Sequence, residues 1–320
     1  MAWLAEAGRS GAGARLATAL AVIAVLALLA GCGNSHDNGE VTLTVGARAT
    51  TEEEVLGQIY VQALREAGYR VKGEVGIETD YRDVPMRELR AGEISGYPEH
   101  VDAVLERELD VSNADLPSDA EQAYDLARTG LEEEGLTAFP PTPYSLSRQI
   151  AFLRKTAEKH DLEKISDLRG SSEKMTLHGF SDCHVSADCL GGMEDKYEVF
   201  FESISYMYYP EELRQRFQFL EDGEYDAVTV YSTDGRLAAE ADKFVALEED
   251  KHVFRAGNVI FVTTEAVVEE AGPDYEETIV AAQEGLDLAT IRRLDAEVEL
   301  DGKKPRAVAA RYLRDTGLVE

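Results

Sequence analysis

The sequence is poor in basic residues: 32 lysines and arginines stand against 62 aspartates and glutamates, and the formal net charge is −30 at pH 7. A nucleic-acid-binding surface needs clustered basic side chains that release phosphate counterions, and docking on anionic lipid needs a basic surface too. The composition therefore argues against both kinds of partner. Much of the acid falls in runs such as Glu52–Glu54 and Glu132–Glu134, which we expect to form a solvated helix surface.

The sequence also lacks the short motifs of common catalytic sites. It contains no Gly-x-Ser-x-Gly turn, Walker loop, His-Glu-x-x-His pair or Cys-x-x-Cys pair. Carboxylates are so numerous that no two of them stand out as an acid/base pair. We therefore expect a binding protein rather than an enzyme, with no cofactor.

One apolar run stands out, from Leu16 to Leu29, and it follows two arginines, Arg9 and Arg15. It is shorter than the about 20 residues that a membrane-spanning helix needs. A positive flank, a short apolar core and small residues predict an export signal. Cys32, directly after Leu-Ala-Gly, resembles the bacterial lipobox cysteine, which receives lipid before the signal is removed. We expect a signal peptide over residues 1–31 and a lipid anchor at Cys32 on the outer face of the cytoplasmic membrane; an uncleaved N-terminal anchor is the alternative.

Cysteines are scarce, and only Cys183 and Cys189 remain besides Cys32. An even pair outside the cytoplasm favours a disulfide, here one that closes a short local loop. A metal site recruiting His178 and His184 with both thiolates is an alternative, and free thiols are another. We expect the disulfide and no metal.

Strand and helix patterns alternate along the chain after a polar tether over residues 32–40. Period-two or short apolar runs predict strands, and apolar residues three and four apart predict helices. The predicted strands cover 41–45, 71–77, 94–97, 149–153, 174–177, 227–231 and 259–263. The predicted helices start at a capping box at Thr51 and continue with 84–91, 156–160, 193–201, 211–220, 264–270 and most of 275–318. This alternation predicts α/β sheets with parallel strand pairs, in two lobes that enclose a ligand cleft.

Six ordered segments resemble the glycine betaine/choline/proline substrate-binding proteins of osmoprotectant ABC importers. They are Gly46–Glu52, Leu56–Tyr60, Leu89–Glu99, Leu162–Leu168, Gly223–Gly235 and Glu297–Lys303. The resemblance implies a two-lobed, type II periplasmic-binding-protein-like fold with hinge-connected lobes. On that basis we expect one lobe over 41–146 plus 255–320 and the other over 147–254. It also implies a monomer that delivers a small zwitterion to ABC permease subunits; a non-transporting envelope sensor on the same scaffold is the alternative.

The resemblance further implies which residues contact the ligand. Family members hold a quaternary ammonium in a box of tyrosines and a carboxylate with basic side chains. Arg48 matches a lysine of the pattern, and Tyr97 and Tyr231 match aromatic positions. His100 and Arg148, however, replace aromatic residues of the box.

The replaced positions leave the cargo open between a betaine or other quaternary amine and an amino-acid-like compound. Arg148 and His100 suit a ligand with an anionic group, although a surface ion pair for Arg148 and a plain helix start for His100 are alternatives. The tyrosines of Ser203–Tyr209 could supply replacement walls, or they could belong to a half-buried strand. We predict ligand contacts from Arg48, Tyr97, His100, Arg148 and Tyr231.

Overall fold

The computed structural model describes residues 38–77, 84–112, 115–184, 189–208, 210–251, 253–255 and 257–319. The predicted signal peptide, the lipidation site Cys32 and the tether up to residue 37 lie outside these residues. The part from Asn38 onward forms one compact unit. Within the described residues, no helix combines the length and the apolar character that crossing a membrane requires.

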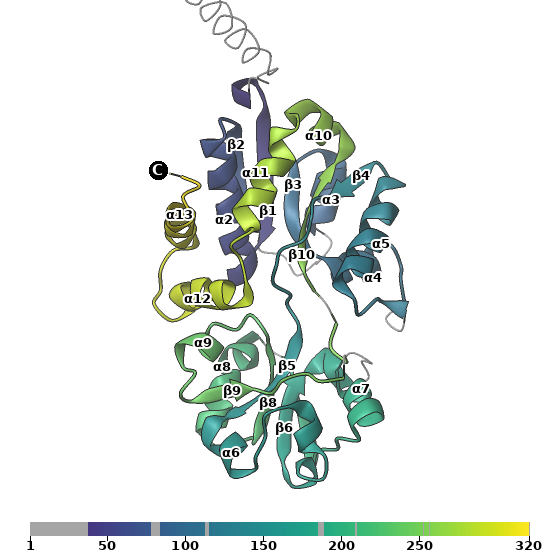
Figure 1. Cartoon of the computed structure of the whole chain (residues 1–320), viewed down its shortest axis with the longest axis vertical. Helices are drawn as coiled ribbons and strands as arrows, with labels where there is room; N and C mark the ends of the chain where they lie inside the picture. Colours follow the sequence, from purple (N-terminus) through teal and green to yellow (C-terminus); the bar gives the residue numbers. More distant parts are fainter. Residues whose placement is uncertain are drawn as a thin grey trace, which may run out of the picture. The chain divides into compact units, whose positions relative to one another are not determined.

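The first of two five-stranded sheets has the order β2-β1-β3-β10-β4 (Figure 1). Its strands are β1 (Thr42–Arg48), β2 (Arg70–Ile77), β3 (Gly96–His100), β4 (Leu136–Ala138) and β10 (Val259–Thr264). Strand β1 pairs in parallel with β2 and β3, whereas β10 is antiparallel to both β3 and β4. Parallel strands that need helical crossovers account for the alternating sequence pattern.

The second sheet repeats this arrangement with the order β7-β6-β8-β5-β9. Its strands are β5 (Arg148–Leu153), β6 (Thr176–Phe180), β7 (Ser203–Met207), β8 (Ala227–Tyr231) and β9 (Phe244–Ala246). Strand β6 is parallel to β7 and β8, and β5 is antiparallel to β8 and β9. We call the parts built on the two sheets the first and the second lobe; the α/β fold predicted from the sequence is confirmed.

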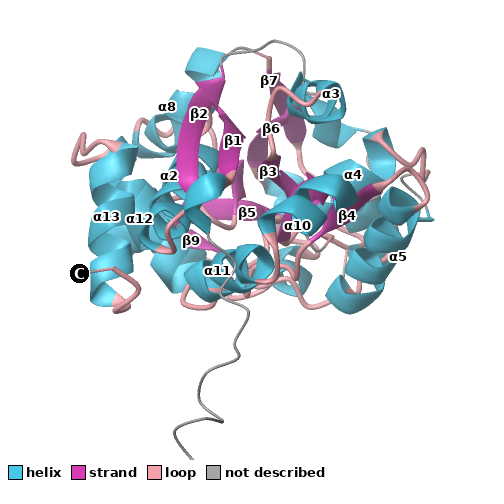
Figure 2. Ribbon diagram, turned by 90° about the horizontal axis from the view of Figure 1, so that it is seen from above, coloured by secondary structure: helices cyan, strands magenta, loops and turns pink. Residues whose placement is uncertain are grey.

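Helices flank both sheets, as Figure 2 shows for the first lobe. The first lobe carries α2 (Thr51–Glu66), α3 (Val84–Ala91), α4 (Val101–Arg107), α5 (Ala120–Glu132), α10 (Glu265–Ala271), α11 (Asp274–Gln283), α12 (Leu288–Glu299) and α13 (Pro305–Asp315). The second lobe carries α6 (Arg154–Lys159), α7 (Leu190–Gly192), a π-helical turn (Met193–Tyr197), α8 (Pro210–Glu221) and α9 (Arg236–Ala239). Short 3-10 turns occupy Asn38–Glu40, Ile165–Leu168, Ser172–Lys174 and Ser181–His184.

The capping of α2 differs from the prediction by one residue. The N-cap is Thr50, whose hydroxyl accepts a hydrogen bond from the Glu53 amide at 3.3 Å, so the predicted cap at Thr51 is wrong. The side chain of Glu53 does not close a capping box; it accepts from the Arg48 amide at 3.1 Å. The hydrogen bond from the Arg48 amide to Glu53 therefore takes the place of the capping-box hydrogen bond that the sequence pattern predicts within the helix.

Two segments connect the lobes, over residues 139–147 and 247–258. They are joined to each other where they cross: Ser145 bridges Asn258, and the Leu146 amide donates to the Gly257 carbonyl at 3.1 Å. The Asn258 side-chain amide donates to the carbonyls of Thr142 and Tyr144, each at 2.9 Å. The strands that follow each segment therefore start from a shared, hydrogen-bonded junction.

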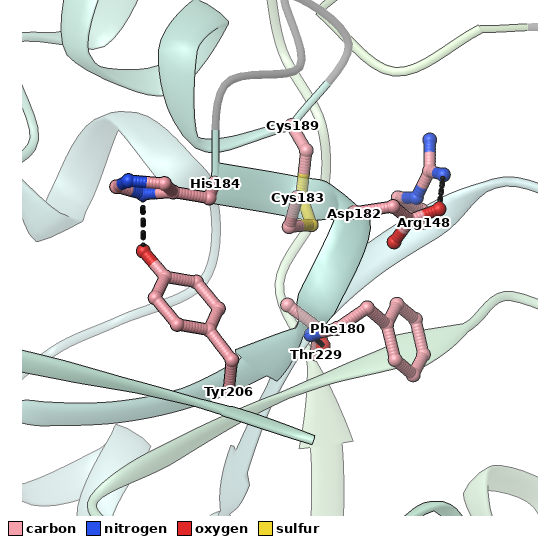
Figure 3. The surroundings of a disulfide bond; sticks show 8 residues. All are labelled: Arg148, Phe180, Asp182, Cys183, His184, Cys189, Tyr206 and Thr229. Carbon is pink, nitrogen blue, oxygen red and sulfur yellow. Dashed lines mark hydrogen bonds and ion pairs between the residues drawn. A yellow bond between two sulfur atoms is a disulfide. The ribbon is translucent and has the colours of Figure 1, made fainter. Parts of the chain in front are cut away.

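The predicted disulfide between Cys183 and Cys189 is confirmed (Figure 3). Both cysteines are fully buried and belong to the core of the second lobe. Their spacing of six residues closes a small loop after β6, so the bond stiffens that end of the sheet. The alternative metal site is not formed, because both sulfurs are consumed by the disulfide.

The core of the first lobe is centred on Phe261 of β10, which is 0% exposed. Its ring centroid lies 5.2 Å from that of Tyr60, 5.8 Å from that of Phe139 and 6.0 Å from that of Tyr275. Rings from a strand, two helices and a connecting segment thus meet at one point. Such contacts add to the hydrophobic stabilisation of the buried area.

We expect Phe261→Ala to lower the free energy of unfolding of the first lobe by about 3–5 kcal/mol, because it removes the ring on which the other three pack. Urea unfolding followed by far-UV circular dichroism measures the change. Leu126→Ala, at a side chain that is 43% exposed, is the control and should change stability by no more than about 0.5 kcal/mol. Equal effects of the two substitutions would contradict this account of the core.

Candidate ligand-binding site

A cavity of about 470 Å³ is lined by residues of both lobes, within the usual range for a small-molecule site. The carboxyl ends of the parallel strands β1 and β3 contribute to it, as expected for ligand sites in α/β sheets. Among the described residues that line it, eight carry carboxyl groups and five carry guanidinium groups. The carboxyl groups belong to Glu52, Glu53, Glu99, Asp102, Asp182, Asp234, Asp295 and Glu299, and the guanidinium groups to Arg48, Arg107, Arg148, Arg216 and Arg255.

Arg48 ends β1 and is held by two buried carboxylates. Its guanidinium donates to the Glu99 carboxylate, with one of the N–O distances at 3.0 Å, and lies 3.5 Å from a carboxylate oxygen of Glu53. Only 11% of the Arg48 side chain is exposed. Because buried charges are costly unless paired, this three-residue cluster fixes the guanidinium in place.

The environment of Glu53 makes its ionisation unfavourable. Burial raises the pKa of this carboxyl group to about 7, although the charge of Arg48 acts in the opposite direction. The neighbouring carboxylate of Glu99 adds to the increase. Burial therefore favours the protonated form of Glu53 more than that of an ordinary glutamate.

His100 lies at the junction of β3 and α4, and both of its ring nitrogens face acceptors. Nδ1 lies 3.2 Å from the Gly257 carbonyl oxygen, and Nε2 lies 3.7 Å from a Glu52 carboxylate oxygen. Burial lowers the pKa of this imidazole, but the charges of Glu52 and Asp102 outweigh it and the net direction is upward. The ring is thus placed to carry a positive charge, because an imidazolium donates from both nitrogens.

Glu52 and Asp295 approach the cavity from α2 and α12 and are almost fully buried, with exposures of 6% and 4%. Glu52 Oε1 accepts a hydrogen bond from the Tyr144 hydroxyl at 2.9 Å. Within the described part of the chain, Glu52 Oε2 and Asp295 Oδ1 have no hydrogen-bond partner. Burial, together with the charge of Glu52, raises the pKa of Asp295 well above its ordinary value.

The expected solvated surface at the start of α2 is therefore wrong for Glu52 and for Glu53, which is 5% exposed. Acidic residues are favoured in the first turn of a helix by the helix dipole, and the sequence shows only that preference. Tertiary packing directs this first turn into the cavity. The other run, Glu132–Glu134, is exposed as expected.

The second lobe brings Arg148 and Tyr231 together as directly opposed residues of the antiparallel pair β5–β8. Opposed residues share one face of a sheet. Arg148 Nη2 donates to Asp182 at 2.7 Å (Figure 3), and the Tyr231 ring stacks on Phe180 at a centroid distance of 4.6 Å. One ion pair and one ring thus flank the cavity on this side.

Four of the five predicted contact residues line the cavity: Arg48, His100, Arg148 and Tyr231. Tyr97 does not; its ring is 1% exposed and belongs to a core cluster with Met86, Leu89 and Val101. Tyr206 and Tyr208 do not line it either. Tyr206 belongs to β7, the half-buried strand that the sequence also predicted, and its hydroxyl meets His184 Nδ1 at 2.6 Å (Figure 3). Tyr208 follows the strand and is 69% exposed, and Tyr209 lies outside the described residues.

The sequence reasoning missed most of the acidic lining. Glu99 and Asp234 lie within segments that resemble the family. Glu99 is near the end of β3 and Asp234 lies just after β8, so a position at the end of a strand could have identified both residues. Asp295 and Arg255 gave no such signal, because only folding brings α12 and the second connecting segment to the cavity. No group of three or more histidine, cysteine, aspartate or glutamate side chains able to hold a metal ion occurs among the described residues.

The raised pKa of Glu53 predicts a pH-dependent stability. An ordinary glutamate ionises near 4.5 in the unfolded chain, so this contribution is fully present below pH 4.5 and is lost as the pH rises to about 7. The loss is at most about 1.4 kcal/mol per pH unit. We expect Glu53→Gln to flatten the fall of the urea midpoint between pH 5 and 7.5. Glu66→Gln, on the exposed end of the same helix, is the control, and equal slopes for the two variants would refute the assignment.

Comparison with known proteins matches residues 41–315 to the family described as the substrate binding domain of ABC-type glycine betaine transport systems. A glycine-betaine-binding protein of Pseudomonas aeruginosa is 27% identical over 294 residues, which cover 87% of this chain and 89% of the relative. An ergothioneine transport permease/ergothioneine binding protein of Helicobacter pylori is 24% identical over 285 residues; the match covers 87% of this chain but 48% of that longer protein.

Solved structures show the same fold. A crystal structure of a glycine betaine/carnitine/choline ABC transporter superposes with a TM-score of 0.76 at 20% identity and covers 87% of this chain and 100% of that chain. The ligand-free glycine betaine-binding protein YehZ of Escherichia coli gives a TM-score of 0.71 at 24% identity, over 87% and 99% of the two chains. The family match spans both lobes and every described residue of the cavity lining. This chain belongs to the family of substrate-binding domains of ABC-type glycine betaine transport systems.

Proposed function

We propose that this chain is the exported receptor of an ABC importer and captures a small zwitterion in the cavity described above. The observation that carries the proposal is the lining itself, in which fixed positive and negative groups from both lobes face one space. A zwitterion offers each sign of charge a partner. The cargo class is a betaine or other quaternary amine, or an amino-acid-like compound.

Arg148 is the proposed anchor of the ligand's carboxylate. Its partner Asp182 is 54% exposed, and an ion pair of this kind contributes little stability in water. A ligand carboxylate can therefore replace Asp182 at small cost. Arg48 is a poorer anchor, because withdrawing it from Glu53 and Glu99 would leave two buried carboxylates without their cation.

Other predicted contacts take supporting roles in this proposal. Arg48 fixes the positions of Glu53 and Glu99 at the cavity edge, and His100 contributes a second positive group beside the crossing segments. Tyr231, stacked on Phe180, offers a ring face or edge to the ligand. Tyr97 has no contact role in the proposal because it belongs to the core.

Ligand capture would proceed by hinge closure, with the lobes at 41–146 plus 255–320 and at 147–254. The lobes already touch where α12 of the first lobe packs against the segment that precedes α9 in the second lobe. Arg292 donates to the Ser232 carbonyl, and Gly235 approaches Ala296 so closely that an added Cβ atom would lie 2.5 Å from the Ala296 amide nitrogen. The two lobes meet there backbone to backbone.

The receptor would act on the outer face of the cytoplasmic membrane, anchored through lipid at Cys32 and tethered by residues 32–40. It would work as a monomer and pass its cargo to ABC permease subunits. The family is one of substrate-binding domains of transport systems, and the proposal includes no chemical step and no cofactor.

The carboxylate anchor can be tested by isothermal titration calorimetry of the full chain with glycine betaine, carnitine, proline betaine, ergothioneine, choline and amino acids. We expect Arg148→Ala to lower the affinity for each carboxylate-bearing ligand that binds. The expected loss is about 10- to 100-fold, the value of one charge-assisted hydrogen bond. Choline, which has no carboxylate, should be unaffected. Arg128→Ala, at an exposed ion pair on α5, is the control. Equal losses for choline and the carboxylates would refute the anchor.

Closure can be tested at Gly235. We expect Gly235→Ala to weaken ligand binding by about 10-fold, because its Cβ atom must push α12 and α9 apart, at a cost of about 1–3 kcal/mol. Calorimetry gives the affinity, and thermal unfolding checks that each lobe is intact. Ala239→Ser, at an exposed position of α9, is the control. Unchanged affinity for Gly235→Ala would show that this contact has no part in closure.

A further inference from the structure

Among the residues that the structure describes, two carboxyl oxygens at the cavity lack the hydrogen bonds that buried acceptors normally have. They are Oε2 of Glu52 and Oδ1 of Asp295, and both side chains are more than nine-tenths buried. Each lines the cavity, one from the first turn of α2 and the other from α12. A buried acceptor without a partner costs about 1–3 kcal/mol, and a charged one costs more, so such groups call for an explanation.

No described side chain supplies that partner. Arg48 donates to Glu99 and lies against Glu53, and Arg216 donates to Asp234. The Tyr144 hydroxyl is engaged by the other oxygen of Glu52. His100 Nε2 also faces that other oxygen, Oε1, at 3.7 Å.

The groups that act on Asp295 electrostatically are themselves acidic: Glu52 on α2, Glu299 on α12 and Asp234 after β8. We call these four residues the acidic corner. Glu299 is within the cavity lining, as is Asp234, so the corner opens on the same space as Arg148 and Tyr231. A cation that enters the corner meets the carboxyl groups of Glu52, Asp295 and Glu299 from the first lobe, whereas Asp234 of the second lobe is already paired with Arg216.

Resting on the proposed zwitterion function, we propose that the cationic group of the ligand carries N–H donors, as in a primary or secondary ammonium or a guanidinium, and that these donate to Glu52 and Asp295. Carboxylates accept hydrogen bonds and bind such cations through short, charge-assisted contacts. One donor cation would satisfy both orphan oxygens at once. The ligand's carboxylate would lie toward Arg148.

A fully methylated ammonium fits the corner poorly. It has no N–H group, so it would exclude water from the two oxygens without giving them a hydrogen bond. Quaternary ammonium groups are held instead by several aromatic faces, whereas Tyr231 is the only phenol or phenyl ring among the described residues of the lining. The chemistry of the lining therefore separates this cargo from the quaternary amines for which several relatives are named.

A methylation series tests the proposal directly, because charge and skeleton stay constant while the number of N–H donors changes. Isothermal titration calorimetry of the full chain would compare glycine, sarcosine, dimethylglycine and glycine betaine. A longer pair, 4-aminobutyrate and its trimethylated form, and L-lysine and L-arginine allow for cargo of greater length. We expect the unmethylated member of at least one series to bind at least 10-fold more tightly than the fully methylated one.

Two variants link that preference to the corner. Glu52→Gln and Asp295→Asn should each lower the affinity for the tightest donor-bearing ligand by about 10- to 100-fold, as expected for loss of one charge-assisted hydrogen bond. The affinity for its fully methylated analogue should change by less than about 3-fold. Glu66→Gln, on α2 but exposed, is the matched control and should change neither. Thermal unfolding of each variant shows whether the lobes remain folded; should either variant unfold, the methylation series alone decides.

The outcomes distinguish this inference from the proposed function. Tighter binding of glycine betaine or another fully methylated ligand than of its donor-bearing analogues would overturn the inference and leave the zwitterion receptor intact. An equal loss of affinity for methylated and unmethylated ligands in Glu52→Gln would also overturn the inference. Binding of no probe in any series, by folded protein, would overturn both.

Discussion

The pairing of Arg48 with Glu53 and Glu99 is the interaction on which the ligand site depends. The three side chains come from the end of β1, the first turn of α2 and the end of β3, so one charge cluster ties three elements at the edge of the first sheet. Each charge is nearly buried and would be costly alone. The cluster therefore fixes where α2 begins relative to the sheet, and with it the position of Glu52 beside the cavity.

Burial gives this acidic protein two kinds of carboxylate. Those on exposed helix faces, such as Glu132–Glu134, interact with water and weak partners, and they account for much of the net charge. Those at the cavity have partners or pKa values that depend on tertiary packing. The pKa of Glu53 is raised to about 7 and the pKa of Asp295 is raised well above its ordinary value, in both cases chiefly by burial. Composition alone does not separate the two kinds.

The binding chemistry of the cavity follows from which charges are already neutralised. Arg48 and Arg216 are held by carboxylates that are themselves buried, whereas Arg148 is paired with the exposed Asp182. The Arg148 guanidinium, whose partner Asp182 is half exposed, therefore lies on β5, and the two carboxyl oxygens that have no hydrogen-bond partner among the described residues lie on α2 and α12. A ligand with separated charges matches this distribution. Binding such a ligand does not require further tyrosine rings besides Tyr231 in the lining.

The alternating α/β pattern, the disulfide and the family can be predicted from the sequence, because period, cysteine number and ordered motifs are local properties of the chain. The family resemblance also singled out Arg48, His100, Arg148 and Tyr231, which line the cavity. The core position of Tyr97, the burial of Glu52 and Glu53 and the approach of Asp295 from α12 cannot be predicted in this way. Burial and charge pairing depend on which elements meet, and residues more than 240 positions apart, such as Glu52 and Asp295, show no common pattern along the chain.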